Sequence, residues 1–421
     1  MAYSIEQSYN IAKERYASLG VDTDKALKIL KDVPISINCW QGDDVSGFEK
    51  EDSSLGGGGI LVTGNFPGKP RNIDEFRKDA EKAFSMIPGK KKLALEAMHG
   101  DYKGKLEGRD KIEIKHFISW VEWAKAVNVG IDYNPTFFSH DYTEDGRTLS
   151  AINEKIRKYW IEHAVRSREI CNYIGKELGQ VCFNNIWIPD GSKDLTVNRL
   201  KHRMLLLKSL DEIFTKKYPE QNMQDSLEPK LFGIGVESYT VGSLEFYLCY
   251  AAKNNVQITL DTGHLHPTEV VSDKISAVIP YVKGVQLHVT RGIRWDSDHV
   301  PIITEELLAI MQEIVRADAL NKVFIGTDYF DASMNRVGAW ALGARSILKA
   351  LLFALLEPTD KIRQYEEEGN NFAKLALLEN LKTMPWGDVW DYFCVSNNVA
   401  CDNDLISQVL KYENEVLRKR V

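Results

Sequence analysis

Four ionisable side chains in the second half of the chain each end a short run of apolar and β-branched residues. They are Glu237, Asp261, His288 and Asp328, which end the runs 232–237, 256–261, 284–288 and 323–328. If these runs are neighbouring parallel strands, the four side chains meet at one edge of the sheet. Three carboxylates beside an imidazole repel one another or share protons unless a cation neutralises them. The pattern therefore predicts a site for a divalent metal such as Mn²⁺, Mg²⁺ or Co²⁺.

The alternation of residues within these four runs supports the same arrangement. Residues two apart in a strand face the same side. The residues on the face opposite the ionisable ends are all apolar: Ile234, Val236, Ile258, Leu260, Val285, Leu287, Val323 and Ile325. We expect this apolar face to pack against helices, so the ionisable ends point the other way.

A second cluster of metal-ligating residue types lies beside the first. His264 comes three residues after Asp261, and Asp296 and Asp298 form a D-x-D pair after the next run. Such a pair puts two carboxylates on one side of an extended loop, although acidic turns are also common on surfaces. Four of the nine histidines lie between positions 264 and 299. We expect His264, Asp296 and Asp298 to hold a second cation. No role is assigned to the two other histidines of this stretch, His266 and His299.

Polar and aromatic residues at other expected strand ends fit a polyhydroxylated substrate. His99 follows the second strand and can contact a sugar oxygen. Glu96, in the same run, either reaches the same interior or makes a supporting hydrogen bond. Trp187 follows the fourth strand; it either offers a flat wall to the C–H face of a sugar or fills the core. Phe330, beyond the last strand, can line an apolar patch at the same mouth.

The elements that must position these side chains alternate between strands and helices. Short β-branched runs predict eight strands at residues 34–39, 92–98, 129–134, 181–186, 232–238, 256–262, 284–289 and 323–328. Longer helical patterns lie between them, for example at 74–86, 149–178, 304–317 and 335–356. Eight strands alternating with helices predict an α/β protein of the (β/α)8 barrel class, whose active sites lie at the carboxyl ends of the strands.

We expect three parts along the chain. Residues 1–32 read as two helices, with Asp22 as a candidate N-cap for the second; residues 33–357 form the barrel; residues 358–421 form a helical extension. A long glycine-rich loop spans residues 41–71, including four glycines at 56–59. It is either a poorly ordered surface loop or a segment that caps the substrate. Its glycine spacing is wrong for a phosphate-binding loop.

The composition is that of an ordinary globular enzyme. The 421 residues include 44% hydrophobic and 27% charged residues, with a net charge of −7. An acidic balance argues against a nucleic-acid or membrane-surface partner. The longest apolar stretch, 347–356, is interrupted by Lys349, so no membrane span is expected. Six scattered cysteines without a C-x-x-C pair indicate reduced, mostly buried thiols, and the N-terminus lacks a secretory signal pattern. We therefore expect a cytoplasmic protein.

Several longer motifs resemble those of the L-rhamnose isomerase family. They are NCWQGDD at 38–44, TGNFPG at 63–68, NIWIPDG at 185–191 and DTGHLHPTE at 261–269. The resemblance extends over almost the whole chain. It implies a (β/α)8 barrel that forms a homotetramer, binds two divalent cations with a preference for Mn²⁺, and interconverts L-rhamnose and L-rhamnulose. Co²⁺, Mg²⁺ or Zn²⁺ are further candidate ions.

Carried onto this sequence, the resemblance implies a role for each candidate residue. A structural metal would be held by Glu237, Asp261, His288 and Asp328. A catalytic metal would be held by His264, Asp296 and Asp298. The sugar contacts would be His99, which is also expected to be catalytic, and Trp187, with Tyr102 and Phe330 near the methyl end.

Two routes are open for the expected isomerisation. In the first, hydrogen moves from C2 to C1 as a hydride, while a metal-bound water placed by Asp296 or Asp298 carries a proton between O2 and O1. In the second, an enediol forms and needs a base on the C–H bond, for which Glu96 and Glu237 are candidates. A metal-dependent ketose 3-epimerase, a phosphodiesterase and a non-catalytic metal protein remain as alternatives to an aldose isomerase.

Overall fold

The fold is built from eight parallel strands that close into a barrel. The computed structural model describes residues 4–49, 62–103, 107–143 and 146–420; the four glycines at 56–59 lie outside these ranges. The strands are β1 Ile35–Asn38, β2 Lys91–Glu96, β3 Gly130–Asn134, β4 Cys182–Ile186, β6 Met223–Leu227, β8 Gln257–Asp261, β9 Val285–Val289 and β10 Val323–Thr327. They close in the order β1-β10-β9-β8-β6-β4-β3-β2. The predicted (β/α)8 class is confirmed.

One of the eight predicted strands is wrong. The fifth strand is β6, not residues 232–238, which form a turn outside the barrel. Gly235 there has a left-handed φ of +86°, and Ile234 is 44% exposed rather than packed against a helix. The apolar run thus belongs to a surface loop. The apolar residues of the other three runs, from β8, β9 and β10, are buried as expected.

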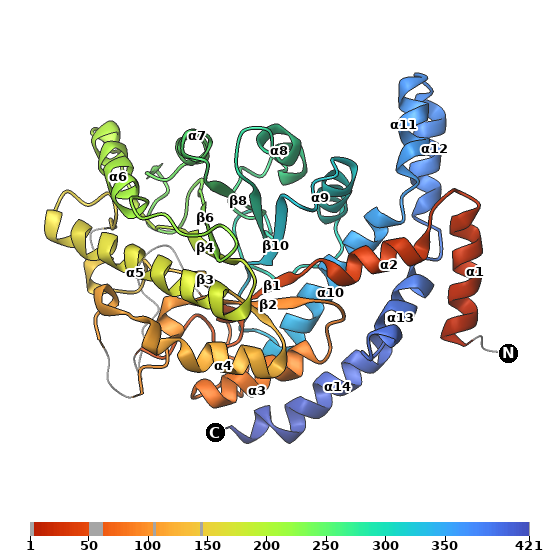
Figure 1. Cartoon of the computed structure of the whole chain (residues 1–421), viewed down its shortest axis with the longest axis horizontal. Coiled ribbons are helices and arrows are strands. Elements are labelled where there is room, and N and C mark those ends of the chain that lie inside the picture. Colours follow the sequence, from red (N-terminus) through yellow and green to blue (C-terminus); the bar gives the residue numbers. More distant parts are fainter. Residues whose placement is uncertain (1–3, 50–61, 104–106, 144–145, 421) are drawn as a thin grey trace.

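Helices cover the outside of the barrel, as Figure 1 shows. They are α3 Ile73–Phe84, α4 Ile118–Val127, α5 Glu154–Leu178, α6 Arg199–Ile213, α7 Leu244–Asn254, α8 Val271–Val278, α9 Glu305–Arg316 and α10 Arg336–Leu355. Each helix after a strand returns the chain to the start of the next, which is the right-handed crossover of parallel sheets. A short antiparallel pair, β5 Gly191–Ser192 and β7 Tyr239–Thr240, joins the loops after β4 and β6.

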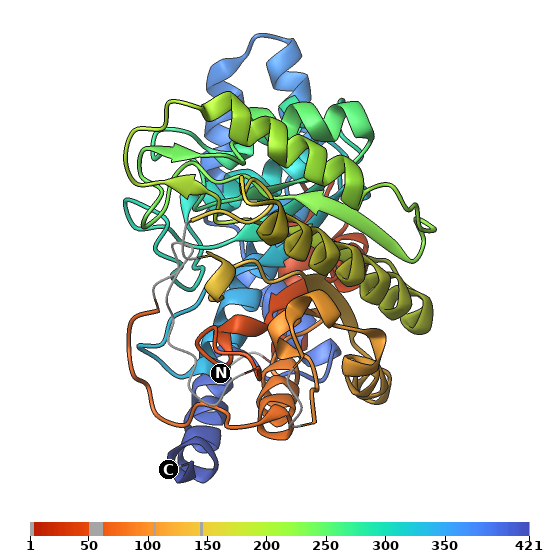
Figure 2. The same cartoon turned by 90° about the vertical axis from the view of Figure 1, so that its left-hand side faces the viewer.

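The two ends of the chain pack against each other beside the barrel. The N-terminal helices are α1 Ile5–Ala17 and α2 Thr23–Asp32, and Asp22 caps α2 as predicted. The C-terminal helices are α11 Thr359–Glu367, α12 Asn371–Leu381, α13 Trp386–Ser396 and α14 Asp402–Glu415. Tyr9 of α1 stacks on Tyr392 of α13 with ring centroids 3.9 Å apart. Helices α11 and α12 project beyond the barrel (Figures 1 and 2).

Helix α10 is the one described helix that is long and apolar enough to cross a membrane. Its most apolar stretch is 78% buried inside the protein, which is the property of a core helix. Trp340 and Arg345 on this helix are fully buried. Arg345 donates to the carbonyls of Met86 and Ala400, so α10 ties the barrel to the C-terminal helices.

Candidate metal centre and active-site pocket

The first candidate metal site lies where four neighbouring strands end. Ligand atoms of Glu228, Asp261, His288 and Asp328 all lie within 4.8 Å of one another. His288 Nδ1 is 3.2 Å from a carboxylate oxygen of Glu228 and 3.2 Å from one of Asp328. Strand register explains the grouping, because β8 pairs Asp261 with His288 of β9. Glu228 and Asp328 each directly follow the last residue of their strand.

Glu237, the predicted fourth ligand, is not part of this cluster. It is exposed, and its carboxylate accepts a hydrogen bond from the Gly235 backbone N–H in the surface turn. Glu228 occupies the position in the cluster that was predicted for Glu237. The reason is that β6, and not residues 232–238, forms the fifth strand. Asn185 donates to Glu228 Oε2 at 2.5 Å, and Thr259 donates to the Asn185 amide oxygen at 2.7 Å. A chain of interior side chains thus orients this carboxylate.

The second candidate site shares Asp261 with the first. Asp261, His264 and Asp296 offer ligand atoms within 4.8 Å of one another. His264 Nε2 lies 3.2 Å from Asp296 Oδ2, and its Nδ1 lies 3.0 Å from the Pro229 carbonyl oxygen. Asp298 lies outside this group but lines the same pocket, and its backbone has a left-handed φ of 48°. The D-x-D loop therefore brings both carboxylates to the pocket.

Several polar atoms in these clusters are buried without a hydrogen-bond partner. They are Glu228 Oε1, Asp261 Oδ2 and Asp296 Oδ1. Leaving such atoms unpaired in a protein interior is costly. Carboxylate oxygens and imidazole nitrogens are the ligands that Mn²⁺ and related divalent ions use. The donor set therefore fits one cation at each cluster.

The charges in the site are strongly coupled. Burial raises the pKa of Glu228, but His288 and His264 outweigh it and bring that pKa to about 2. Burial lowers the pKa of His264, but Asp261 and Asp296 raise it to about 9. Burial, together with neighbouring carboxylates, holds the pKa of Asp298 well above its usual range. Without a cation, the site therefore keeps protons that a bound metal would displace.

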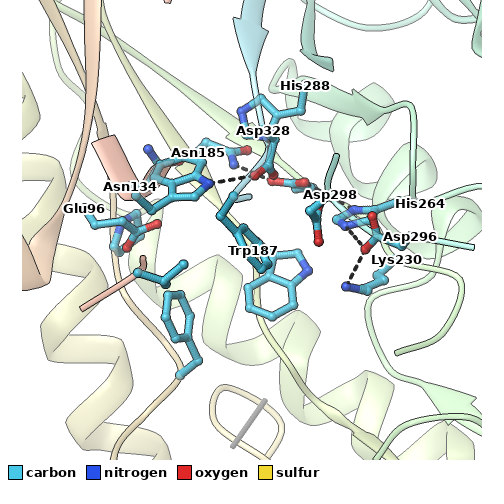
Figure 3. Close-up of a pocket in the computed structure, with 16 residues that line it drawn as sticks. Glu96, Asn134, Asn185, Trp187, Lys230, His264, His288, Asp296, Asp298 and Asp328 are labelled. Atoms are coloured by element: carbon cyan, nitrogen blue, oxygen red, sulfur yellow. Dashed lines mark hydrogen bonds and ion pairs between the residues drawn. The ribbon is translucent and has the colours of Figure 1, made fainter. Parts of the chain in front are cut away.

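A pocket opens beside the two clusters, and Figure 3 shows its lining. Besides ligand residues, its walls are formed by Trp40, Val45, Glu96, Asn134, Pro135, Phe138, Asn185, Trp187, Lys230 and Phe330. Lys230 Nζ lies 2.8 Å from Asp296 Oδ2 and 5.3 Å from the centre of the Trp187 ring. Trp40 donates its indole N–H to Asp328 Oδ1 at 2.9 Å. Aromatic walls with a few convergent polar groups suit a small polar ligand.

Comparison with known proteins assigns the chain to a family. The model of the family described as L-rhamnose isomerase matches residues 3–420. The chain belongs to the L-rhamnose isomerase family. It is 52% identical over 416 residues to the L-rhamnose isomerase of Bacteroides thetaiotaomicron, covering 99% of both chains. It is 50% identical over 419 residues to that of Rhodopirellula baltica, covering 100% of this chain and 98% of the relative.

Solved structures of low sequence identity also match this member of the L-rhamnose isomerase family. A structure of L-ribulose 3-epimerase matches with a TM-score of 0.47 and 11% identity, covering 79% of this chain and 97% of that one. A D-psicose 3-epimerase in the presence of D-fructose matches with a TM-score of 0.44 and 14% identity, covering 66% of this chain and 92% of that one.

Two predicted sugar contacts of this L-rhamnose isomerase family member do not reach the pocket wall. His99 is fully buried, with its Nε2 2.9 Å from Asp43 Oδ2 and its Nδ1 3.4 Å from the Cys39 sulfur. Tyr102 is buried and donates to the Ala97 carbonyl oxygen at 3.0 Å. Strand β2 ends at Glu96, and the following turn Ala97–His99 leaves Glu96, not His99, on the pocket.

Other candidates divide between pocket and surface. Trp187 and Phe330 line the pocket as expected. His266 is exposed and bonds Thr268, while His299 bonds Ser297. Lys230 was not among the site residues predicted from the sequence. The signal available for it was its position two residues after Glu228, but that strand itself was not recognised.

Proposed function

We propose that this protein is an L-rhamnose isomerase that interconverts L-rhamnose and L-rhamnulose with the help of two divalent cations. The observation that carries the proposal is the pair of carboxylate–imidazole clusters sharing Asp261 beside one pocket. Membership of the L-rhamnose isomerase family supports the choice of substrate.

The first cation would be held by Glu228, Asp261, His288 and Asp328, and the second by Asp261, His264, Asp296 and Asp298. We propose Mn²⁺ as the ion, with Co²⁺, Mg²⁺ or Zn²⁺ as substitutes. Bound in these clusters, a divalent cation would polarise a sugar carbonyl and lower the pKa of the neighbouring hydroxyl. Carboxylate oxygens and imidazoles accept several first-row ions, so geometry alone favours none of them.

The chain's own residues orient and hold the substrate. Trp187 and Phe330 offer flat apolar surfaces to the C–H faces of the open-chain sugar. Lys230 fixes Asp296 through their ion pair and adds positive charge where oxygen becomes negative. Trp40 fixes Asp328 by a hydrogen bond from its indole N–H. Of the two carboxylates on the pocket, Asp298 would hold the proton that passes from O2 to O1. Burial and neighbouring carboxylates raise its pKa, whereas Lys230 and His264 outweigh burial and lower the pKa of Asp296.

We propose that the C2 hydrogen moves directly to C1 as a hydride. The C1 carbonyl becomes a C1 hydroxyl, the C2 hydroxyl becomes a C2 carbonyl, and the proton from O2 is delivered to O1. Glu237, one base considered for the enediol route, lies in an exposed turn, and Glu96 is the candidate left. L-rhamnose deuterated at C2 separates the routes: retention of deuterium at C1 of L-rhamnulose supports the hydride shift, and exchange with water in every turnover contradicts it.

The proposed activity is tested by stripping the protein with a chelator and restoring Mn²⁺. L-rhamnose, L-mannose and D-xylose are offered in parallel, and the ketose is quantified. We expect little conversion without metal and rapid conversion of L-rhamnose, above the other two sugars, once Mn²⁺ is restored. Conversion of ketoses at C3 without aldose formation would instead indicate an epimerase, and metal binding without any sugar turnover would indicate a non-catalytic protein.

We further propose a cytoplasmic homotetramer. The location is supported by thiols kept free and mostly buried, with Cys39, Cys171, Cys182 and Cys394 inside the protein. The assembly is supported by exposed apolar side chains on the projecting helix α12, where Phe372 is 84% exposed and Leu375 is 68% exposed. Light scattering of the purified protein measures the assembly directly.

A further inference from the structure

Arg109 is a buried arginine that binds two loops at the mouth of the barrel. It begins the short turn Arg109–Lys111 and is 4% exposed. Its Nη1 donates to the carbonyl oxygens of Thr136 at 2.9 Å and Phe138 at 2.6 Å. Its Nε and Nη2 donate to the carboxylate of Glu49. A planar guanidinium suits this role, because its donors are fixed in a fork.

The carbonyls that Arg109 binds belong to one wall of the pocket. Asn134, Pro135 and Phe138 line the pocket, and the Thr136 hydroxyl donates to Glu96, which lines it too. Phe138 packs edge-on against Trp187 with ring centroids 5.9 Å apart. We call residues 134–138 the β3 wall. Arg109 therefore acts on the pocket through the backbone of this wall, without touching the pocket itself.

The β3 wall lies across the pocket from the second metal cluster. In Figure 3, Glu96 and Asn134 lie on the opposite side from His264, Asp296 and Lys230. A sugar bound to the clusters by its first two oxygens would direct its far end toward this wall. The part of the pocket lining that this wall supplies includes the apolar side chains of Pro135 and Phe138. That far end would therefore meet these two apolar side chains next to the polar Glu96 and Asn134.

Other bonds hold Arg109 itself in place. The Tyr159 hydroxyl accepts a hydrogen bond from the Arg109 N–H at 2.9 Å, and His163 Nδ1 lies 3.0 Å from the Arg109 carbonyl oxygen. Glu49 supplies the balancing charge at 2.9 Å. Removing one partner of a buried ion pair leaves the other unpaired and is costly. Arg109 is thus held rigidly enough to fix the position of the β3 wall.

From this geometry we propose that Arg109 is a positioning residue that sets the β3 wall against Trp187 and so determines selectivity for aldoses with an apolar far end. The inference rests on the proposed function. This role explains why an arginine, and not an apolar residue, is buried here. The carbonyl oxygens of Thr136 and Phe138 need a hydrogen-bond donor, which an apolar side chain lacks.

The chain contains a matched control for this arginine. Arg168, on α5, makes the same kind of bonds: it pairs with Asp225 and donates from Nη1 to the carbonyls of Ile213 and Lys216. It is 3% exposed, and none of these partners lines the pocket. Arg168→Lys therefore removes the hydrogen bonds of a buried guanidinium, with a similar cost in stability, but it leaves the β3 wall unchanged.

The test compares Arg109→Lys with Arg168→Lys in the Mn²⁺-loaded full-length protein. We measure kcat and KM for L-rhamnose and for L-mannose, which carries a hydroxymethyl group in place of the methyl. Loss of bonds to a charged donor predicts a rise of about tenfold in KM for L-rhamnose in Arg109→Lys, with kcat within about threefold. The preference for L-rhamnose over L-mannose should narrow. Arg168→Lys should change neither KM nor the preference.

Equal KM and an equal preference in the two variants would overturn the positioning role. If Arg109→Lys does not fold, Glu49→Gln is tested instead. This variant weakens the ion pair with Arg109 but keeps a hydrogen-bond acceptor. An unchanged preference for L-rhamnose over L-mannose in Glu49→Gln would overturn the positioning role of Arg109. Binding of L-rhamnose is also followed by tryptophan fluorescence. If the unaltered protein does not turn over L-rhamnose but Arg109→Lys binds it more weakly, the proposed function is overturned and the positioning role is not.

Discussion

Lys230 joins the aromatic wall of the pocket to the second metal cluster. Burial lowers its pKa, but Asp296 and Asp298 outweigh burial and raise that pKa above its usual range, so the ammonium stays charged. We predict that Lys230→Gln lowers kcat for L-rhamnose by about 100-fold or more, the usual effect of removing a positioned donor near developing charge. Steady-state rates with saturating Mn²⁺ test this.

Lys193 provides the control for that prediction, since its side chain is exposed and lies outside the pocket lining. Lys193→Gln should keep the rate of the unaltered protein. A Lys230→Gln variant with full kcat would show that the ammonium only balances charge in the metal-free site.

His163 makes the stability of the protein depend on pH. It is fully buried, and burial together with Arg109 lowers its pKa to about 3. An unfolded histidine takes up a proton near pH 6.5. Between pH 6.5 and 3 the unfolded state therefore binds a proton that the folded state does not, so the free energy of unfolding falls as pH falls. From this residue we predict a loss of about 2 kcal/mol between pH 7 and pH 5.

Denaturant unfolding at the two pH values measures that loss. In His163→Gln the corresponding part of the pH dependence should vanish, because glutamine does not titrate. The same slope in both proteins would show that other groups cause it.

At the residue scale, part of the site could be read from the sequence. Asp261, His288 and Asp328 end apolar strands, and the period of two predicted their grouping. Glu228 could not be found in this way, because its strand is polar in three of five positions. His99 was misplaced because a turn follows Glu96 and buries the histidine against Asp43. Roles that depend on a single turn of backbone cannot be derived from periodicity.

At the scale of elements, β6 shows how a polar strand is stabilised inside a barrel. Ser226 bonds Thr259 in the interior, while Asp225 on the outer face pairs with Arg168 of α5. Strand propensity from apolar residues is therefore not needed there. The run 232–238 has that propensity but contains Gly235 with a positive φ, and it forms a turn. In both segments, contacts with the rest of the protein outweighed the strand propensity of the local sequence.

Helix α5 packs closely against the loop before β6 through a glycine. A Cβ atom at Gly175 would lie 1.7 Å from the Asn222 carbonyl oxygen, a backbone atom that cannot move away cheaply. We predict that Gly175→Ala destabilises the protein by about 2 kcal/mol or more, despite the better helix propensity of alanine. Thermal unfolding of the two proteins measures the difference.

Gly387 in α13 is the matching helical glycine without such a neighbour, since nothing lies within 4 Å of a Cβ built there. Gly387→Ala should be neutral or stabilise by up to about 1 kcal/mol. Equal effects of the two substitutions would mean that the close approach of α5 does not limit its packing.

At the scale of the whole molecule, closure of the barrel brings residues from position 228 to position 328 to one point. The alternation of strands and helices was sufficient to predict this class, because few other folds accommodate eight such units. The helical extension after residue 358 was also predicted, from the absence of further strand patterns. The way α13 packs on α1 was not, since it depends on contacts such as Tyr9 on Tyr392.

Metal binding to the whole protein should depend on pH. The pKa of His264 is raised to about 9 in the metal-free site, above its usual 6.5, so this imidazole must lose a proton before it can bind a cation. Displacement of at least this one proton predicts that the Mn²⁺ affinity rises about tenfold or more per pH unit between pH 6 and 8. Calorimetric titration at three pH values, in buffers of different ionisation enthalpy, counts the protons released. A pH-independent affinity would contradict the assignment of His264 as a ligand.

We expect isomerisation to depend on a cation that is held by the side chains ending β6, β8, β9 and β10. The most direct test is a Mn²⁺ titration of the metal-stripped protein, of Glu228→Gln and of Glu237→Gln, followed by L-rhamnulose formation and by the amount of metal bound. Glu237→Gln should behave as the unaltered protein, while Glu228→Gln should bind Mn²⁺ at least about tenfold more weakly and be nearly inactive. Full metal binding and activity in Glu228→Gln, or their loss in Glu237→Gln, would contradict it.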